Sequence, residues 1–272
     1  MDLDFSEAEI QRYSRHILLD EVGALGQAKL RAARVLVVGA GGLGSPLILY
    51  LTAAGVGLIG VCDDDAVELS NLQRQIAHGV ADIGSSKVES AIKAAGALNP
   101  LVSLRAHETR LSVENVMGLI ADYDIICDCS DNFATRFLLA DACFFAGKIL
   151  VSAAVLRFEG QLSTFRPGSG ESCYRCLYPE MPPAGLVPSC AEAGVLGAVT
   201  GVMGTLQATE VLKEILQIGE SMAGRLLIWD GLSARFRTIK LMRDPECALC
   251  GSAPSLHANL AHHFGNGPAC GH

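Results

Sequence analysis

The sequence predicts an α/β protein with a doubly wound, Rossmann-like sheet that is extended by antiparallel strands and carries a four-cysteine zinc site. Three observations predict this class. Short apolar segments alternate with helical patterns across residues 34–154, residues 39–44 form the glycine-rich turn GAGGLG, and two C-x-x-C pairs follow in the second half. Strands that alternate with helices, joined by right-handed crossovers, are typical of a doubly wound parallel sheet.

Composition excludes several classes of protein. The 272 residues are 50% hydrophobic, which is enough for a substantial core, and the net charge is −8. No run of lysine or arginine is present, which argues against a nucleic-acid partner. The acidic start MDLDFSEAE has no apolar core of a signal peptide, so a cytoplasmic location is expected. The most apolar stretch, 194–216, contains threonine, glutamate and lysine, so we expect a buried helix there and no membrane span.

The first half of the chain supplies the parallel sheet. Residues 6–20 read as a helix with a serine N-cap, and 34–38 as a strand whose glycine turn leads into a helix through about Ala54. The same reasoning predicts further strands at 58–63, 102–107, 124–131 and 148–154, and further helices at 85–99, 112–121 and 132–147.

From about residue 155 the pattern changes. Residues 157–167 and 224–243 read as antiparallel strands that extend the sheet or cover its edge, with the 194–216 helix between them, and 179–189 as a proline-rich loop. We expect one domain at 1–251. Its parts are N-terminal helices at 1–33, a nucleotide-binding core at 34–154 and an antiparallel, zinc-bearing part at 155–251, followed by a disordered tail at 252–272.

Ten cysteines occur in the chain. Without a signal peptide, disulfides are a poor interpretation. Cysteines within apolar strands and helices are explained as small hydrophobic side chains: Cys62, Cys127, Cys129 and Cys143. Two C-x-x-C turns, by contrast, match a tetrahedral zinc site closed by four thiolates: Cys173, Cys176, Cys247 and Cys250. Such a site is structural, because no ligand position stays open for water, and it contributes on the order of 10 kcal/mol to folding.

Polar residues after the second strand point to a nucleotide. Asp63 follows that strand and suits the ribose hydroxyls of either NAD or ATP. The next segment carries Asn71, Arg74 and Gln75, and Lys87 follows it. Arginine and lysine together suit a triphosphate, because arginine grips phosphate oxygens in pairs and lysine adds a point charge. The alternative is a solvated face with two ordinary cations.

Asp131 ends the fourth predicted strand, at the edge where open α/β sheets bind ligands. A carboxylate that faces a triphosphate is repelled unless a cation lies between them. Asp131 therefore reads as a Mg²⁺ ligand, since Mg²⁺ needs only one or two carboxylates beside phosphates and water. The alternative is that Asp131 caps the following helix, and one residue can serve both purposes.

The ordered motifs RYSRH, GAGGLGS, DDDAVELSNLQRQ, GSSKVES, DCSDN, EGQ, CYRC, SCAEAGV and CALC resemble the bacterial E1-like enzymes of the MoeB/ThiF/HesA family. The resemblance covers about residues 6–251. It implies ATP-dependent adenylation of the C-terminal glycine of a ubiquitin-like sulfur-carrier protein, with pyrophosphate as the second product. The motifs favour a MoaD-like carrier of molybdopterin biosynthesis, with a ThiS-like carrier of thiamin biosynthesis as the alternative. More remote alternatives are an NAD-dependent oxidoreductase and a non-enzymatic zinc-stabilised interaction module.

The resemblance also implies roles for individual residues. Gly42 approaches the nucleotide, and Arg15 of one subunit reaches the ATP of its partner in a homodimer. Cys190 matches a cysteine that takes part in sulfur transfer, with a bystander in a loop as the alternative. A separate sulfur donor, a cysteine desulfurase or a rhodanese, is expected. The residues implied to line the ATP site are Asp63, Ser70, Asn71, Leu72, Gln73, Arg74, Gln75, Lys87, Asp131 and Asn132, of which Arg74, Lys87 and Asp131, with Arg15, are the candidate catalytic groups.

Overall fold

One mixed sheet of eight strands runs through the computed structural model, which describes residues 3–183 and 193–260. The strands lie in the order β3-β2-β1-β4-β5-β6-β7-β8, and β1 to β5 are parallel whereas β5 to β8 pair antiparallel. Their bounds are β1 Arg34–Val38, β2 Leu58–Asp63, β3 Ser103–Glu108, β4 Ile125–Asp128, β5 Ile149–Leu156, β6 Glu159–Phe165, β7 Arg225–Asp230 and β8 Arg235–Lys240. The predicted parallel sheet with an antiparallel extension is confirmed.

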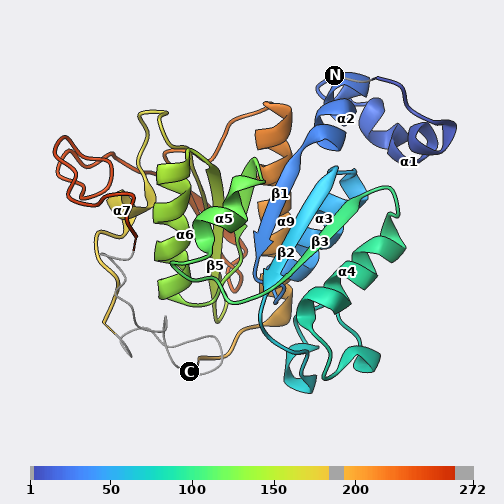
Figure 1. Cartoon of the computed structure of the whole chain (residues 1–272), viewed down its shortest axis with the longest axis horizontal. Helices are drawn as coiled ribbons and strands as arrows, with labels where there is room; N and C mark the ends of the chain where they lie inside the picture. Colours follow the sequence, from blue (N-terminus) through green and yellow to red (C-terminus); the bar gives the residue numbers. More distant parts are fainter. Residues whose placement is uncertain (1–2, 184–192, 261–272) are drawn as a thin grey trace.

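Helices cover both faces of this sheet (Figure 1). They are α1 Glu7–Ile17, α2 Gly23–Ala32, α3 Gly44–Ala54, α4 Lys87–Leu98, α5 Val116–Ala121, α6 Phe133–Ala146, α7 Tyr174–Leu177 and α9 Gly197–Leu216, with short 3₁₀ turns η1 Leu69–Asn71 and η2 Val80–Asp82. One core joins the sheet to α3, α4 and α9, and a second joins it to α5 and α6. Strand β1 contributes side chains to both cores, because successive side chains of a strand point to opposite faces of the sheet. Val35 and Val37 belong to the first core, and Leu36 and Val38 belong to the second.

Local sequence signals set several helix starts. Ser6 caps α1 in a reciprocal capping box with Glu9, and Ser86 caps α4. The alternative that Asp131 caps the helix after β4 is wrong. The N-cap of α6 is Asn132, whose side chain accepts a hydrogen bond from the Thr135 N–H. Asp131 is therefore not the N-cap and is left for another role.

Strand β4 is shorter than the sequence predicts. It ends at Asp128, three residues before the predicted end at Asp131. The reason is local: the Ser130 N–H donates to the Asp128 carboxylate at 3.0 Å and not to a neighbouring strand. The chain therefore leaves the sheet early, and Asp131 lies on the loop that follows.

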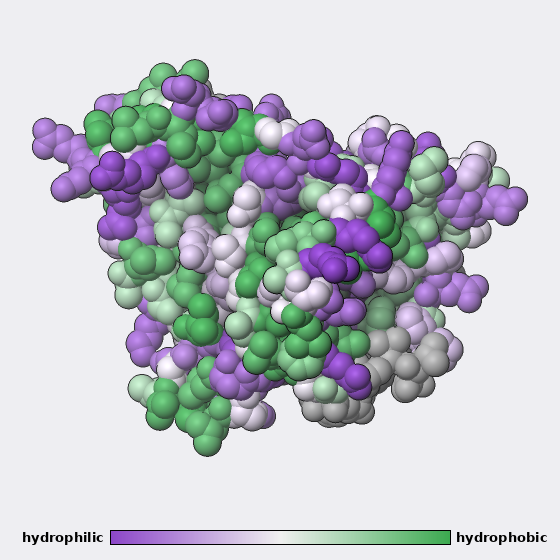
Figure 2. Space-filling view, turned by 180° about the vertical axis from the view of Figure 1, so that it is seen from behind, coloured by the Kyte–Doolittle hydropathy of each residue, from purple (hydrophilic) through white to green (hydrophobic). Residues whose placement is uncertain are grey.

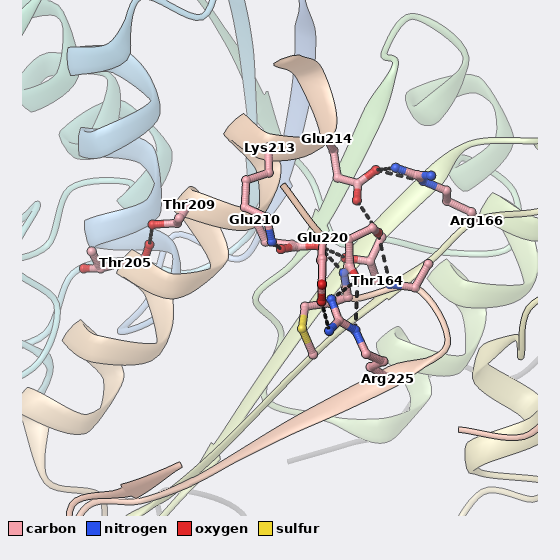
Figure 3. A network of polar contacts seen from close by, with 12 residues as sticks. Thr164, Arg166, Thr205, Thr209, Glu210, Lys213, Glu214, Glu220 and Arg225 are labelled. Atoms are coloured by element: carbon pink, nitrogen blue, oxygen red, sulfur yellow. Dashed lines mark hydrogen bonds and ion pairs between the residues drawn. The ribbon is translucent and has the colours of Figure 1, made fainter. Parts of the chain in front are cut away.

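Helix α9 is fixed to the sheet at its C-terminal half by buried charges (Figure 3). Glu210 accepts from Thr164 Oγ1 of β6 at 3.1 Å and pairs with Lys213. Glu214 accepts from Arg166 Nε at 2.9 Å. Both carboxylates are buried, and burial of a carboxylate is tolerated only when several donors satisfy it. The network therefore holds α9 in one position against β6.

The chain beyond Gly251 remains part of the folded protein for some distance. Ser255 N and Leu256 N both donate to the Ala248 carbonyl, and Leu260, only 3% exposed, joins the second core. The tail predicted to start at 252 is therefore ordered through residue 260, because an apolar side chain finds a site in the core. The segments 184–192, which includes part of the predicted loop and Cys190, and 261–272 lie outside the described residues.

Several apolar side chains of the N-terminal helices face solvent. Leu18, Leu19 and Leu25 are exposed around α1 and α2, as is Tyr50 on α3. Figure 2 shows hydrophobic surface at the corner where these helices lie and at further points on the face behind the sheet. No helix among the described residues is both long and apolar enough to cross a membrane.

A first prediction concerns the close contact of α9 with α3. A Cβ on Gly204 would lie 2.4 Å from the Leu43 carbonyl oxygen and 2.6 Å from Pro46, whereas a Cβ on Gly201 of the same helix would meet nothing within 4 Å. Gly204→Ala should lower the free energy of unfolding by about 1–3 kcal/mol through overpacking. Gly201→Ala should leave it unchanged or raise it by up to about 1 kcal/mol. Urea unfolding of the two variants tests this, and equal stabilities would contradict the predicted contact.

Candidate functional site

The glycine turn runs from β1 into α3 with backbone packed against backbone. Gly39 has φ +98°, which other residues rarely adopt, and a Cβ there would lie 2.8 Å from the Cys129 carbonyl oxygen. A Cβ on Gly44 would lie 1.9 Å from the Gly39 carbonyl oxygen. A Cβ on Gly42 would lie 3.1 Å from the side chain of Thr200 on α9. These contacts explain the glycines of the turn and keep its backbone close to α9.

Asp63, the last residue of β2, is bonded to this glycine turn. One carboxylate oxygen accepts from the Ala40 N–H at 2.7 Å and the other from the Asp65 N–H at 2.9 Å. Burial raises the pKa of Asp63, while the positive charge of Lys87 and the two hydrogen bonds oppose that rise. Each oxygen retains acceptor capacity toward the open side of the turn, as an acceptor for a sugar hydroxyl requires.

Lys87 begins α4, and its side chain is only 9% exposed. Its Nζ lies 2.6 Å from Asp65 Oδ2, and its backbone N–H donates to the Asp65 carbonyl at 3.0 Å. The ammonium is thus held at the end of β2, beside Asp63. Two contacts to one residue fix a side chain that would otherwise be flexible.

The crossover between β2 and α4 carries the remaining polar residues and brings one of them, Gln75, to the glycine turn. Asn71 is buried and accepts from the Glu68 N–H at 3.1 Å, and Arg74 Nη1 donates to the Ser70 carbonyl. Gln75 is 4% exposed, and its Nε2 is 3.5 Å from the position of a Cβ on Gly41. The Gln75 Oε1 is buried and has no hydrogen-bond partner among the described residues. Leu72 is half-buried, while Ser70 and Gln73 are exposed.

Asp131 lies at the same edge, on the loop after β4. Its side chain is exposed and accepts no hydrogen bond from the described residues. Beneath it lies a buried group that the sequence did not reveal. Asp128 accepts from Ser130 Oγ at 2.6 Å and Ser152 Oγ at 2.7 Å, and Arg136 Nη1 lies 3.9 Å from it.

Arg136 ties that loop to β5. Its Nη1 donates to the Ala153 carbonyl at 3.2 Å and its Nη2 to the Ser130 carbonyl. The sequence shows an acidic residue at 128 and a basic residue at 136, but it does not show that they meet. Their partners Ser152 and Ala153 on β5 lie too far along the chain. Together the two residues fix the backbone that carries Asp131.

A cavity of about 210 Å³ opens next to Asp131. Strands β5 and β6 form its floor, and Tyr178 and Leu177 line it beside α7. Tyr178 Oη donates to Gln161 Oε1 at 2.9 Å within this lining. The cavity is lined mostly by apolar side chains, and the exposed Asp131 is among its lining residues.

Arg15 lies apart from these residues. It is exposed on α1, whose Tyr13 packs against Gly55 at the C-terminal end of α3. The glycine turn lies at the other end of α3, about 15 Å away for a helix of this length. Figure 1 likewise shows α1 at the end of the sheet where β1 begins. Within one chain, Arg15 does not join the predicted site, and Cys190 lies outside the described residues.

The four cysteines of the two C-x-x-C turns meet in one cluster. Cys173 Sγ lies 3.6 Å from Cys247 Sγ, and Cys176 Sγ lies 3.3 Å from Cys250 Sγ. Four sulfurs around zinc at about 2.3 Å would be separated by about 3.8 Å, close to the separations found. All four ligand atoms lie within 4.8 Å of one another, so the donor set fits Zn²⁺. Of the remaining cysteines, Cys62, Cys127, Cys129 and Cys143 are buried as predicted.

The cluster is anchored to the main domain. Arg175, between the first two ligands, donates to both carboxylate oxygens of buried Asp141 on α6, at 3.1 and 2.7 Å. Its guanidinium also lies over the Phe137 ring at 4.5 Å. A bidentate pair of this kind is among the stronger polar contacts in proteins. The cysteine cluster therefore joins the end of the chain to α6 and cannot move independently of it.

Comparisons with known proteins find a matching family model and relatives in sequence and in fold. The family model described as "ThiF family" matches residues 13–249. The chain is 53% identical over 252 residues to the Bos taurus protein "Adenylyltransferase and sulfurtransferase MOCS3", covering 92% of this chain but 55% of that one. It is 47% identical over 255 residues to the Thermus thermophilus "Sulfur carrier protein adenylyltransferase", covering 92% and 94% of the two chains.

Solved structures share the fold. A crystal structure of E. coli MccB with MccA-N7isoASN matches with a TM-score of 0.79 at 22% identity, covering 89% of this chain and 75% of that one. At that identity the match establishes the architecture alone. The chain spans little more than half the length of the Bos taurus relative, which therefore contains a further region that this chain does not match.

A second prediction follows from the cysteine cluster. The purified chain should contain one zinc ion, measured by atomic emission. Cys250→Ser should lose the metal and melt at a lower temperature, because the site contributes folding free energy. Cys143→Ala is the matched control, since it removes a buried thiol that lies outside the cluster and should retain zinc. Full zinc occupancy in Cys250→Ser would contradict the assignment.

Proposed function

The chain belongs to the ThiF family, and from this membership we propose that it uses ATP to adenylate the C-terminal glycine of a ubiquitin-like sulfur-carrier protein. The products would be a carrier acyl-adenylate and pyrophosphate. We favour a MoaD-like carrier for molybdopterin biosynthesis and keep a ThiS-like carrier for thiamin biosynthesis as the alternative. The name of the Thermus thermophilus relative supports the general class of substrate.

One observation carries the proposal. Three charged residues lie on the segments around the glycine turn: Asp63 accepts from the Ala40 N–H of the turn, the buried Lys87 pairs with Asp65 next to Asp63, and Arg74 lies beside Gln75, whose amide reaches Gly41. A nicotinamide dinucleotide would use the turn and Asp63 but would have no need for the two cations. A triphosphate uses all three, because its charge is met by the cations and its ribose by the carboxylate.

The chemistry needs positioning more than acid–base catalysis. A carboxylate oxygen of the carrier attacks the α-phosphorus of ATP, the new oxygen–phosphorus bond forms, and the bond to the bridging oxygen of pyrophosphate breaks. The nucleophile is already an anion, so no proton has to be removed. Negative charge grows on the phosphoryl oxygens and the leaving pyrophosphate, where Lys87, Arg74 and Asn71 would donate hydrogen bonds.

Asp131 is the residue that we propose holds Mg²⁺. Its exposed carboxylate lacks a donor among the described residues, and Asp128 and Arg136 fix the loop that carries it. Mg²⁺ prefers oxygen ligands and commonly binds one carboxylate together with phosphates and water, so the single side chain fits. When bound, the ion would offset the charge of the phosphates.

The cavity beside Asp131 is where we propose the carrier tail enters. Glycine residues have no side chain, so an extended Gly-Gly end could enter this cavity, which Tyr178 and residues of β5 and β6 line. Asp131 is among the lining residues, so the carrier carboxylate would lie near the proposed magnesium ligand. A carrier with bulky residues at its end would not reach it.

We also propose that the chain acts as a homodimer in the cytoplasm and receives sulfur for its carrier from a separate cysteine desulfurase or rhodanese. Arg15 supports the dimer, because it is exposed and lies at the end of α3 remote from its own glycine turn. The exposed leucines of the same helices provide apolar surface for a second copy, which Figure 2 shows as the hydrophobic corner. In such a dimer Arg15 would serve the partner's ATP.

The third prediction tests the reaction through ATP–pyrophosphate exchange with MoaD-like and ThiS-like carriers offered separately. One carrier should support exchange only with its Gly-Gly end intact. Asp131→Ala should lower the exchange rate at least about 100-fold, because a ligand for transition-state charge is lost. Asp122→Ala, at a surface pair with Arg105, should leave the rate near normal. No exchange with either carrier would contradict the proposed function, and near-normal exchange by Asp131→Ala would remove that residue from the metal role.

The fourth prediction tests the shared site. Chains with Arg15→Ala and chains with Lys87→Ala should each be inactive alone. After mixing and subunit exchange, a heterodimer has one intact site, so activity should recover to about a quarter of wild type at most. Mixing either variant with itself is the control. A mixture that forms heterodimers but regains no activity would contradict the role of Arg15.

A further inference from the structure

We propose that His78 is a positioning residue for the nucleotide: its imidazole holds the Ala40 carbonyl inward and so turns the Gly41 N–H toward the phosphates. This inference rests on the proposed use of ATP. His78 lies on the crossover after Gln75, is 7% exposed, and belongs to no motif on which the function was based.

Both ring nitrogens of His78 are engaged. Nε2 lies 3.0 Å from the Ala40 carbonyl oxygen, and Nδ1 lies 2.9 Å from Ser90 Oγ. A carbonyl can only accept, so Nε2 must carry the proton of this hydrogen bond. Burial lowers the pKa of His78, which favours the neutral ring. Nδ1 of the neutral ring then accepts from the Ser90 hydroxyl, and the tautomer is fixed.

The consequence for the glycine turn follows from peptide geometry. In a planar trans peptide, the C=O of one residue and the N–H of the next point in opposite directions. Because the Ala40 C=O points to buried His78, the Gly41 N–H points the other way, out of the interior. That N–H donates to no residue that the structure describes. Free backbone N–H groups of such a turn are the donors that cradle phosphate.

Ala40 is held from the other side as well. Its own N–H donates to Asp63, the proposed ribose ligand. One residue of the turn is therefore clamped at both its N–H and its C=O. The Ala40 carbonyl also accepts from Ser45 Oγ at 3.5 Å, so His78 is the nearer of its two donors. Rotation of the peptide between Ala40 and Gly41 would turn the buried carbonyl away from both donors, which is unfavourable.

His78 also joins the other parts of the proposed site. Ser90 is on α4, three residues after Lys87 and so on the same face of the helix. The crossover that carries His78 carries Arg74 as well. One imidazole thus connects the glycine turn, the helix of the lysine and the segment of the arginine. Loss of that connection should affect ATP binding before it affects the chemical step.

The fifth prediction compares two amides at this position in the full chain. In His78→Gln the amide nitrogen reaches the place of Nε2, whereas in His78→Asn it reaches only the place of Nδ1. Calorimetry with ATP and Mg²⁺, without carrier, should show that His78→Asn raises the Kd for ATP at least about 10-fold, as expected for a lost bond to a charged group. His78→Gln should stay within about threefold of wild type. In the exchange assay, KM for ATP should rise in His78→Asn while kcat changes less.

His107→Gln is the control for disturbance of a histidine that is half-buried and hydrogen-bonded elsewhere in the fold. Its Nε2 contacts Tyr123 Oη at 2.7 Å, beside the second core and with no contact to the glycine turn. It should alter the melting temperature without altering ATP affinity. Equal ATP affinity in His78→Asn and wild type, or equal losses in the Asn and Gln variants, would overturn the inference. Wild-type protein that binds no ATP would overturn the proposed function and this inference with it.

NMR of the wild-type protein tests the inference even if a variant at position 78 does not fold. Long-range ¹H–¹⁵N NMR of the ¹⁵N-histidine-labelled protein with ATP should show His78 as the neutral tautomer protonated at Nε2. The tautomer protonated at Nδ1 cannot donate to Ala40. Its observation would overturn the inference without any substitution.

Discussion

The close approach of backbone to backbone at the glycine turn is the constraint on which the rest of the structure depends. Gly44 lies so near the Gly39 carbonyl that any side chain would collide with it, and a Cβ on Gly39 would lie 2.8 Å from the Cys129 carbonyl oxygen after β4. The turn can therefore form only where β1, β2 and β4 end together. That edge then receives Asp63 from β2 and Asp131 from the loop after β4.

Helix α9 closes the same region from a distant part of the sequence. Its Gly204 admits the backbone of Leu43, and Gln207 donates to the Asp128 and Val151 carbonyls at 3.0 and 2.9 Å. The buried carboxylates farther along α9 secure its other end to β6 (Figure 3). A helix that follows residues 184–192 thus supports both the glycine turn and the ends of the parallel strands. The second half of the chain is therefore needed to complete the edge of the sheet that carries the glycine turn.

The features predicted correctly from sequence are those with local causes. Alternation of strands and helices, the glycine turn and the two C-x-x-C pairs each depend on neighbouring residues, and the structure confirms the fold and the cysteine cluster. Other features were missed because they depend on distant partners. His78 contacts Ala40 across 38 positions, and nothing near His78 in the sequence indicates that bond. The early end of β4 and the Asn132 cap have local causes, but the sequence does not show which of the neighbouring residues Asp128, Asp131 and Asn132 accepts from the backbone there. The order of residues 252–260 depends on a core site for Leu260 that the sequence does not show.

The proposed reaction at this edge of the sheet joins a carrier carboxylate to the α-phosphorus of ATP. The intact mass of a MoaD-like carrier tests it, measured after incubation with the zinc-loaded chain, ATP and Mg²⁺ and quenching in acid. The carrier should become heavier by one adenylyl group, attached at its terminal glycine and absent when that glycine is removed. An unmodified carrier, with either a MoaD-like or a ThiS-like protein, in the presence of folded chain that binds ATP would contradict it.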